Sequence, residues 1–341
     1  MKKIVICADG TWNKPEKNLK KDFPTNVLKF ARGLATHNGN KKQIVFYDWG
    51  IGSYHDNFAG GALGKGLEKN VKDCYRFLVH NYEIGDEIYL FGFSRGAYTI
   101  RSLCGLINNC SILKSSGGRY LEEAFDLYKT KRHKARSNHA IKWRSEYAVQ
   151  DKTMIKFVGV WDTVGAMGLP FSLFGLIEKK HLFYDRKLGS NIIKARHALS
   201  LDEQRDDFDP TIWEPREGVD LKQVWFAGVH CDAGGSYKPD DNKTCLADIP
   251  MLWMLKEAEA SGLAFETYLS DIEINPLASQ HNEFKWHYLA LGKKQRKIPN
   301  YKTIPTYVHK SVKQRYDGME YTSKTIENYV KQYGEWPPIV E

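Results

Sequence analysis

A serine flanked by glycines is the feature of the sequence best suited to chemistry. Ser94 lies at the centre of GFSRG at 92–96, between the apolar run Ile88–Phe91 and a segment whose apolar residues have helical spacing. A nucleophilic serine on a sharp strand-to-helix turn needs small residues two positions before and after it, because larger side chains would collide with the strand and the helix. The spacing predicts Ser94 as the nucleophile of a serine hydrolase.

Two later strand ends supply a base and an acid. Asp162 follows the apolar run Ile155–Trp161, and His230 follows the run Val224–Val229. A histidine takes the proton of an attacking serine, a carboxylate orients that histidine, and in hydrolases of this topology the chain order is Ser, Asp, His. We expect Asp162 and His230 at the same sheet edge as Ser94, since the carboxyl ends of parallel strands meet there.

Both assignments have rivals. Asp232 lies two residues beyond His230 and is an alternative acid, and Asp162 also suits a purely structural role as the cap of the following turn. His309, in YVHKSV, follows another candidate short strand and is an alternative base.

The first apolar run, Ile4–Ala8, ends in DGTWN at 9–13. A turn at this point can offer the backbone N–H groups of Gly10 and Thr11 to an oxyanion, beside the N–H of Arg95, the residue after the nucleophile. Asp9 suits a second role, accepting N–H groups of its own loop as in an Asx turn.

The rest of the pattern shows which elements position these residues. Short, continuously apolar runs suit strands of a parallel sheet that is covered on both faces; they are Ile4–Ala8, Val45–Trp49, Ile88–Phe91, Ile155–Trp161 and Val224–Val229. Helical patterns alternate with them: a stripe of Leu67, Val71, Cys74 and Leu78, a helix from Ser94 through Leu106, and a helix opening at Asp248 with Gly262 beyond its end. The predicted class is α/β, an α/β-hydrolase-like, doubly wound and mainly parallel sheet.

Two intervals interrupt this alternation within what we expect to be one domain, residues 1–341. Residues 111–150 are basic and rich in tyrosine, and residues 167–222 begin with an apolar cluster followed by two lysines. We interpret both as helical lid or cap insertions, because insertions in such folds emerge where ligands bind. The apolar cluster at 167–184 suits either an amphipathic lid that meets acyl chains or a segment buried against the sheet.

The composition and charge indicate which classes of partner to expect. A formal net charge of +9 favours anionic partners, and peripheral contact with an anionic membrane surface is one expectation. The densest basic runs, at 129–144 and 293–297, are not interleaved with aromatic residues, so we expect no nucleic-acid binding. The apolar runs are too short for a signal peptide or a transmembrane helix, which predicts a cytoplasmic protein or one exported without a cleavable signal peptide.

Neither a cofactor nor a metal is expected. The six cysteines are scattered without CxxC pairs and are interpreted as free thiols in a reducing compartment. Asp9 and Asp48 are isolated carboxylates, and two such residues do not define a metal site.

The sequence resembles an uncharacterised α/β-hydrolase family, domain of unknown function 2235, which includes phospholipase effectors of bacterial type VI secretion. The shared segments are ADGTWN at 8–13, GFSRGAYTIRSL at 92–103, GVWDTVGA at 159–166, HALSLDEQRDDFDP at 197–210, QVWFAGVHCDAGGSY at 223–237, LADIPMLWMLKEA at 246–258 and VHKSV at 308–312. The resemblance implies carboxylic ester hydrolysis by a triad of Ser94, Asp162 and His230, and leaves the substrate open.

We therefore expect a serine esterase or lipase that forms an acyl-enzyme, with an ester or a lipid ester as substrate. The alternatives are a catalytically silent module of the same fold and an esterase for small molecules. A nucleic-acid-binding protein, suggested by the charge alone, is the remaining rival, and strongly salt-dependent binding would distinguish it.

Overall fold

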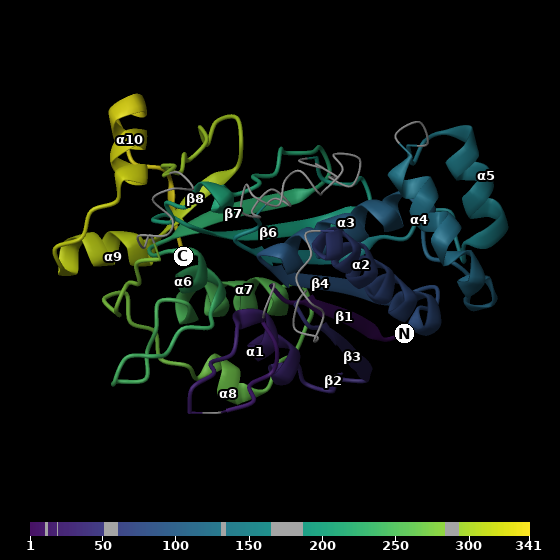
Figure 1. Cartoon of the computed structure of the whole chain (residues 1–341), viewed down its shortest axis with the longest axis horizontal. Helices are drawn as coiled ribbons and strands as arrows, with labels where there is room; N and C mark the ends of the chain where they lie inside the picture. Colours follow the sequence, from purple (N-terminus) through teal and green to yellow (C-terminus); the bar gives the residue numbers. More distant parts are fainter. Residues whose placement is uncertain (11–12, 19, 51–60, 131–133, 165–186, 284–292) are drawn as a thin grey trace.

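The computed structural model describes the chain except residues 11–12, 19, 51–60, 131–133, 165–186 and 284–292. Its described strands form a nine-stranded sheet in the order β2-β3-β1-β4-β5-β6-β7-β8-β9 (Figure 1). The strands are β1 Lys3–Ala8, β2 His37–Asn38, β3 Lys41–Asp48, β4 Glu87–Phe93, β5 Ile155–Trp161, β6 Ile192–Ser200, β7 Asp220–Phe226, β8 Thr306–His309 and β9 Ile339–Val340. All neighbours pair in parallel except the short β2, which is antiparallel to β3.

Helices cover both faces of the sheet, which confirms the predicted α/β class. The described helices are α1 Asn26–Gly33, α2 Gly61–Asn81, α3 Arg95–Cys110, α4 Leu121–Lys129, α5 Asn138–Tyr147, α6 His230–Gly234, α7 Asp248–Glu259, α8 Thr267–Ser270, α9 Lys310–Gly318 and α10 Lys324–Tyr333, with short 3₁₀ helices η1 Ser115–Tyr120 and η4 Asp206–Phe208. One hydrophobic core joins the sheet to α2, α3 and α4, and a second joins its other face to α1 and α7. Figure 1 shows α1, α7 and α8 together on one side of the sheet.

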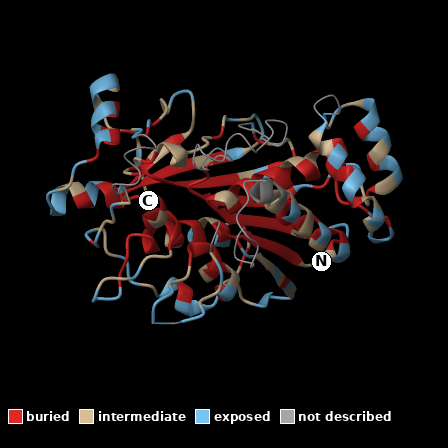
Figure 2. Cartoon of the chain, in the orientation of Figure 1, coloured by how far each residue is buried: buried red, intermediate tan, exposed pale blue. Residues whose placement is uncertain are grey.

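The two cores explain why the buried part of a central strand such as β4 is apolar. In β4, Ile88 and Leu90 enter the core with α2 and α3, whereas Tyr89, Phe91 and Phe93 enter the core with α1 and α7. A strand with successive side chains on opposite faces must be apolar at every position when both faces are covered. Figure 2 shows the resulting buried central strands and exposed outer helical faces.

The chain changes direction across the sheet between β1 and β4. From β1 it continues to β3 on one side, while β4 lies on the other side of β1 and is followed by β5. Ligands of open α/β sheets bind beyond the carboxyl ends of the strands at such a switch point. The register pairs Ala8 with Gly92, so the turn after β1 lies beside the turn that carries Ser94.

The interval 167–222 is not a continuous insertion. Its residues Ile192–Ser200 form β6, a central strand between β5 and β7, and β7 already starts at Asp220. Polar residues within the strand concealed it: Arg196 is 3% exposed and bonds to Glu257 and Asp220, and His197 is fully buried. The proposed amphipathic lid, residues 167–184, lies outside the described residues, which resume at 187.

The interval 111–150 is helical, as predicted. It lies at the amino ends of the strands, whereas a lid over Ser94 would lie at their carboxyl ends. It contains η1, α4 and α5 and follows α3, which starts beside Ser94 and runs back along the sheet for 16 residues, about 24 Å. Its ends meet next to the start of β5, where the Val149 N–H donates to the Ile112 carbonyl. The insertion therefore packs at the amino ends of the strands, opposite Ser94 (Figure 1).

The described helices include none that is long and apolar enough to cross a membrane. All six cysteines are free thiols, and all but Cys231 are buried.

Candidate active site

Ser94 occupies the strained turn that the glycine pattern predicts. Its φ of 56° and ψ of −122° lie in a region that residues with side chains rarely adopt. A Cβ at Gly92 would lie 2.7 Å from the Cα of Ala97, and a Cβ at Gly96 would overlap the backbone carbonyl of Ala8. The two glycines thus let α3 pack against β4 and β1 directly after the serine, and the sequence prediction of a strand-to-helix turn is confirmed.

Asp162 and His230 are brought together from strand ends 68 residues apart. His230 Nδ1 lies 2.6 Å from Asp162 Oδ2, with His230 3% exposed and Asp162 fully buried. A carboxylate can only accept hydrogen bonds, so Nδ1 carries the proton and Nε2 is the basic nitrogen. Asp162 itself has a φ of 40°, a second positive φ at a strand end on this edge.

Arg296 holds Asp162 in its ionised form. Its two terminal nitrogens donate to the two Asp162 oxygens at 2.6 and 2.9 Å, and the backbone N–H of Ser200 donates to Oδ1 at 2.9 Å. Burial alone would raise the pKa of Asp162, but the charge of Arg296 and the hydrogen bonds from His230 and Arg296 outweigh it and hold the pKa far below its usual range.

Burial keeps the His230 imidazole neutral. Desolvation lowers its pKa below the ordinary 6.5, and the opposing contact with Asp162 only partly compensates. The ring stacks on Phe93 with centroids 4.6 Å apart and meets Phe208 edge-on at 4.9 Å. Because Phe93 directly precedes Ser94, this stacking sets the imidazole next to the nucleophile turn.

The segment after β6 supports the histidine from a third side. Glu203 is buried, accepts the His230 backbone N–H at 3.2 Å and is paired with Arg205 at 2.7 Å. Burial would raise the pKa of Glu203, but Arg205 outweighs it and lowers the pKa to about 2. This carboxylate stays ionised and fixes the backbone of the base at the first residue of α6.

Asp232, the alternative acid, binds a different histidine. Its Oδ1 lies 2.8 Å from His281 Nδ1, and its Oδ2 accepts the Val229 N–H at 3.0 Å, which caps α6. The alternative base, His309, caps α9: its Nδ1 accepts the Ser311 N–H at 3.2 Å, and burial lowers its pKa to about 4. Neither rival contacts the Asp162–His230 pair.

The turn after β1 shows the loop-holding role predicted for Asp9, which is compatible with the other predicted role, oxyanion binding. The Gly10 N–H donates to Asp9 Oδ1 at 2.7 Å, while Asp9 Oδ2 accepts from Thr25 and Tyr47 at 2.6 and 2.7 Å. Asp9 thus organises the loop, and the Gly10 N–H already has a partner. Arg95 is the first residue of α3, as expected for an oxyanion donor, and Thr11 lies outside the described residues.

Asp48 lies at the end of β3 beside this turn, where its carbonyl accepts the Asp9 N–H at 3.0 Å. Burial raises the pKa of its carboxyl to about 7. Across the described part of the chain, no cluster of three or more histidine, cysteine or acidic side chains has the geometry of a metal site.

Sequence reasoning missed Arg296. It belongs to the basic run KKQRK at 293–297, to which we assigned no part in the active site, yet it is 2% exposed. Its carboxylate partner, Asp162, is 134 residues away in the sequence, so no local pattern distinguishes it from its exposed neighbours.

The chain forms a parallel sheet with helices on both faces, a serine on the turn after β4, and a carboxylate–imidazole pair from the segments that follow β5 and β7. Together these features define a class of α/β protein in which hydrolases are common. Over residues 2–257 the chain matches the family described as type VI secretion system phospholipase effector Tle1-like, catalytic domain, and it belongs to that family. The resemblance to type VI phospholipase effectors is thereby confirmed.

Other similar proteins extend well beyond this chain. The uncharacterized protein YEL023C of Saccharomyces cerevisiae is 27% identical over 237 residues, 63% of this chain and 33% of the yeast protein. An uncharacterized protein from Pseudomonas aeruginosa is 16% identical with a TM-score of 0.43, over 80% of this chain and 47% of that one. The Tle1 effector bound to the VgrG spike is 19% identical with a TM-score of 0.38, over 70% and 51%. The chain spans about a third to a half of these proteins, and the yeast relative shows that such sequences are not confined to bacteria.

Proposed function

We propose that this protein hydrolyses carboxylic esters of lipids, with Ser94 as nucleophile, His230 as general base and acid, and Asp162 as the residue that orients His230. The observation that carries the proposal is the buried 2.6 Å contact between Asp162 and His230 beside the strained turn of Ser94. A neutral imidazole with a fixed tautomer next to a serine on such a turn is the arrangement that activates a hydroxyl.

The reaction takes place in two steps. The Ser94 Oγ attacks the ester carbonyl and its proton passes to His230 Nε2, which then protonates the departing alcohol. A water molecule attacks the acyl-enzyme after giving a proton to the same nitrogen, and Ser94 recovers its proton as the acid leaves. We assign stabilisation of the oxyanion to the Arg95 N–H and to the turn at Gly10 and Thr11. If the Gly10 N–H binds the oxyanion, it either keeps its hydrogen bond to Asp9 at the same time or gives that bond up.

The lipid substrate is proposed from the family, whose description names phospholipase effectors. The aromatic rings of Phe93 and Phe208 that enclose His230 agree with an apolar substrate. Peripheral contact with an anionic membrane surface remains part of this proposal, in line with the net charge of +9.

Labelling with a fluorophosphonate probe tests the nucleophile, because only an activated serine reacts. We expect the wild-type protein and Ser145→Ala, a surface control on α5, to be labelled, and Ser94→Ala to be unlabelled while keeping the wild-type melting temperature. Labelling of Ser94→Ala would disprove the assignment, and an unlabelled wild type would indicate the catalytically silent module.

The substrate class is tested with p-nitrophenyl esters of graded chain length and with phospholipid vesicles, following fatty-acid release by mass spectrometry. We expect release from vesicles that disappears in Ser94→Ala. Hydrolysis of short soluble esters alone would restrict the function to a small-molecule esterase.

A further inference from the structure

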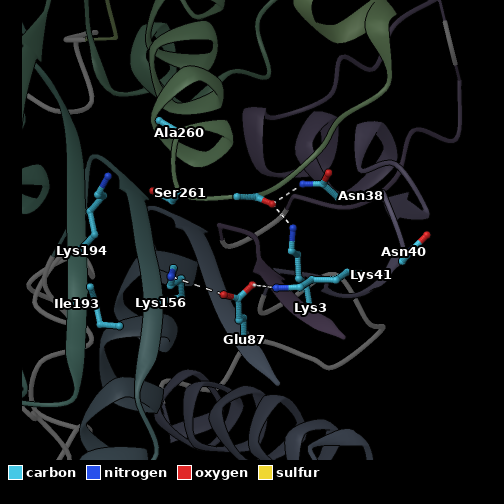
Figure 3. Close-up of a pocket in the computed structure, with 11 residues that line it drawn as sticks. Lys3, Asn38, Asn40, Lys41, Glu87, Lys156, Ile193, Lys194, Ala260 and Ser261 are labelled. Carbon is cyan, nitrogen blue, oxygen red and sulfur yellow. Dashed lines mark hydrogen bonds and ion pairs between the residues drawn. The ribbon is translucent and has the colours of Figure 1, made fainter. Parts of the chain in front are cut away.

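A second concave site lies at the opposite edge of the sheet from Ser94. A pocket of about 660 Å³ is formed where β1, β3, β4, β5 and β6 begin, and the turn after α7 closes one side of it. This volume is in the range of small-molecule sites. Figure 3 shows lysines on separate strands around it: Lys3, Lys41, Lys156 and Lys194.

The pocket has far more positive than negative charge. Among the described residues that line it, Glu87 is the one carboxylate. Each of its oxygens has a lysine at a distance longer than a hydrogen bond: Lys156 at 3.5 Å and Lys41 at 3.8 Å. Figure 3 shows these two lysines on either side of Glu87. Glu87 therefore lies between two ammonium groups and makes a short ion pair with neither of them.

Lys194 adds a further ammonium whose neighbouring carboxylate is already occupied. Its Nζ lies 3.9 Å from Asp220, which accepts a bidentate pair from Arg196 at 2.8 and 3.0 Å. Arg196 bonds to Glu257 as well, and Lys222 shares that glutamate. The two surrounding carboxylates thus form their short contacts with Arg196 and Lys222. Lys194 lines the pocket with only a long contact to a carboxylate.

Lys3 forms the inner part of the pocket. It is 3% exposed and its ammonium donates to the Gly262 carbonyl, which also accepts from Asn38 at 2.7 Å. Burial lowers the pKa of Lys3, Glu87 opposes this, and the charges of Lys41 and Lys156 lower it further. An anion in the pocket would relieve this repulsion, because opposite charges at short range favour the ionised lysines.

From this geometry we infer that the pocket at the amino ends of the strands binds a phosphate group carrying more than one negative charge. Several ammonium donors on separate strands suit the oxygens of such an anion, and phosphate is a common ligand of lysine. The group is either part of a soluble phosphorylated molecule or a lipid head group. A head group bound here is not the one whose ester reaches Ser94, because the two sites lie at opposite ends of the same strands.

Calorimetric titration with pyrophosphate tests the inference, with acetate as the reference anion. We expect one saturable site per chain, weakened at least about tenfold in the double variant Lys156→Ala, Lys194→Ala. A matched double variant on the insertion side, Lys142→Ala, Lys152→Ala, removes the same charge from exposed positions outside the pocket and should bind as the wild type does. Glu87→Gln should bind pyrophosphate several-fold more tightly, because it removes the competing charge.

Flotation with vesicles of phosphatidylcholine containing a phosphatidylinositol phosphate identifies the source of the phosphate. If the wild type binds pyrophosphate and the double variant Lys156→Ala, Lys194→Ala does not, the ligand is a soluble phosphate. If the wild type binds only the vesicles and the same double variant does not, the ligand is a lipid head group. Either result supports the inference. Equal binding of acetate and pyrophosphate, or equal losses in the two double variants, would overturn it. Neither readout depends on ester hydrolysis, so the result is independent of the proposed function.

Discussion

Asp162 carries more interactions than the orientation of one histidine requires. Its two oxygens accept hydrogen bonds from His230, Arg296 and Ser200 within a fully buried environment. We therefore expect its replacement to affect both catalysis and stability. Asp232 instead caps α6 and contacts His281.

We predict that Asp162→Asn lowers kcat by roughly 10³-fold or more, because the imidazole loses its orienting charge. It should also lower the melting temperature, since Arg296 is left as a buried charge without a carboxylate. Asp232→Asn is the matched variant and should cost much less in kcat. Ester hydrolysis and thermal unfolding measured on both variants decide the assignment, and a larger kcat loss in Asp232→Asn would make Asp232 the acid.

The two candidate bases give a second comparison. His230→Ala should reduce kcat on the order of 10³-fold or more, because no other group described near Ser94 takes its proton. His309→Ala should mainly destabilise the start of α9, by about 1 kcal/mol for a lost cap. Steady-state kinetics at matched folded fractions separates the two effects, and the reverse ranking would assign the base to His309.

Arg296 should control the pH range of activity. His230 acts as a base only when neutral, and since its pKa lies below 6.5, the acid limb of kcat/KM should lie below that pH. Arg296→Gln leaves the Asp162 charge unopposed and raises the pKa of His230, so the limb should move to higher pH by roughly one unit.

The control for this shift is Arg196→Gln. It removes a buried arginine that bonds to Asp220 at the start of β7, away from Asp162. It should lower the melting temperature and leave the pH profile unchanged. An Arg296→Gln profile that coincides with the wild-type profile would limit Arg296 to a structural role.

Among the elements, the turn between β4 and α3 has no room for a side chain at its glycines. Gly96→Ala places a methyl group against the Ala8 carbonyl, a backbone group that cannot rotate away. We expect the free energy of unfolding to fall by roughly 1–3 kcal/mol or more, with loss of activity. Gly118→Ala in η1, whose new Cβ would have its nearest neighbour at 3.9 Å, should change stability little. Denaturant unfolding of both variants measures the difference, and similar values would refute the packing argument.

The sequence predicted those elements whose burial is purely apolar. Every strand expected from a continuous apolar run is present, and the helix opening at Asp248 starts there. β6 was missed because Arg196 and His197 are buried by pairing with partners from other elements. The position of 111–150 depends on the length of α3, which carries the chain to the far edge before the insertion begins.

The positions of the candidate residues were predictable where a strand end marks them, as for Ser94, Asp162 and His230. Their mutual contacts were not, and neither was the separate use of Asp232 by His281, since both depend on which segments fold next to α6. Gly10 shows a further limit: the turn suits two roles that are compatible with each other, and the structure shows the contact with Asp9 that belongs to one of them.

At the scale of the whole molecule, charge and apolar surface should together govern access to lipid. The apolar cluster at 167–184 lies outside the described residues, so the predicted lid remains a prediction. Replacing Phe171, Leu173 and Phe174 by serine should reduce hydrolysis of anionic vesicles and spare a short soluble ester. Equal losses on both substrates would place the segment in the core.

The burial of the cysteines has a practical consequence for attaching reporters. Thiol reagents attack the thiolate, and burial raises the pKa of Cys110, Cys231 and Cys245 to about 12 in each case. In Lys142→Cys the new, exposed thiol on α5 should therefore react much faster at neutral pH than these native ones. A fluorophore or linker attached there would tether the protein by the edge remote from Ser94, with the nucleophile turned away from the support.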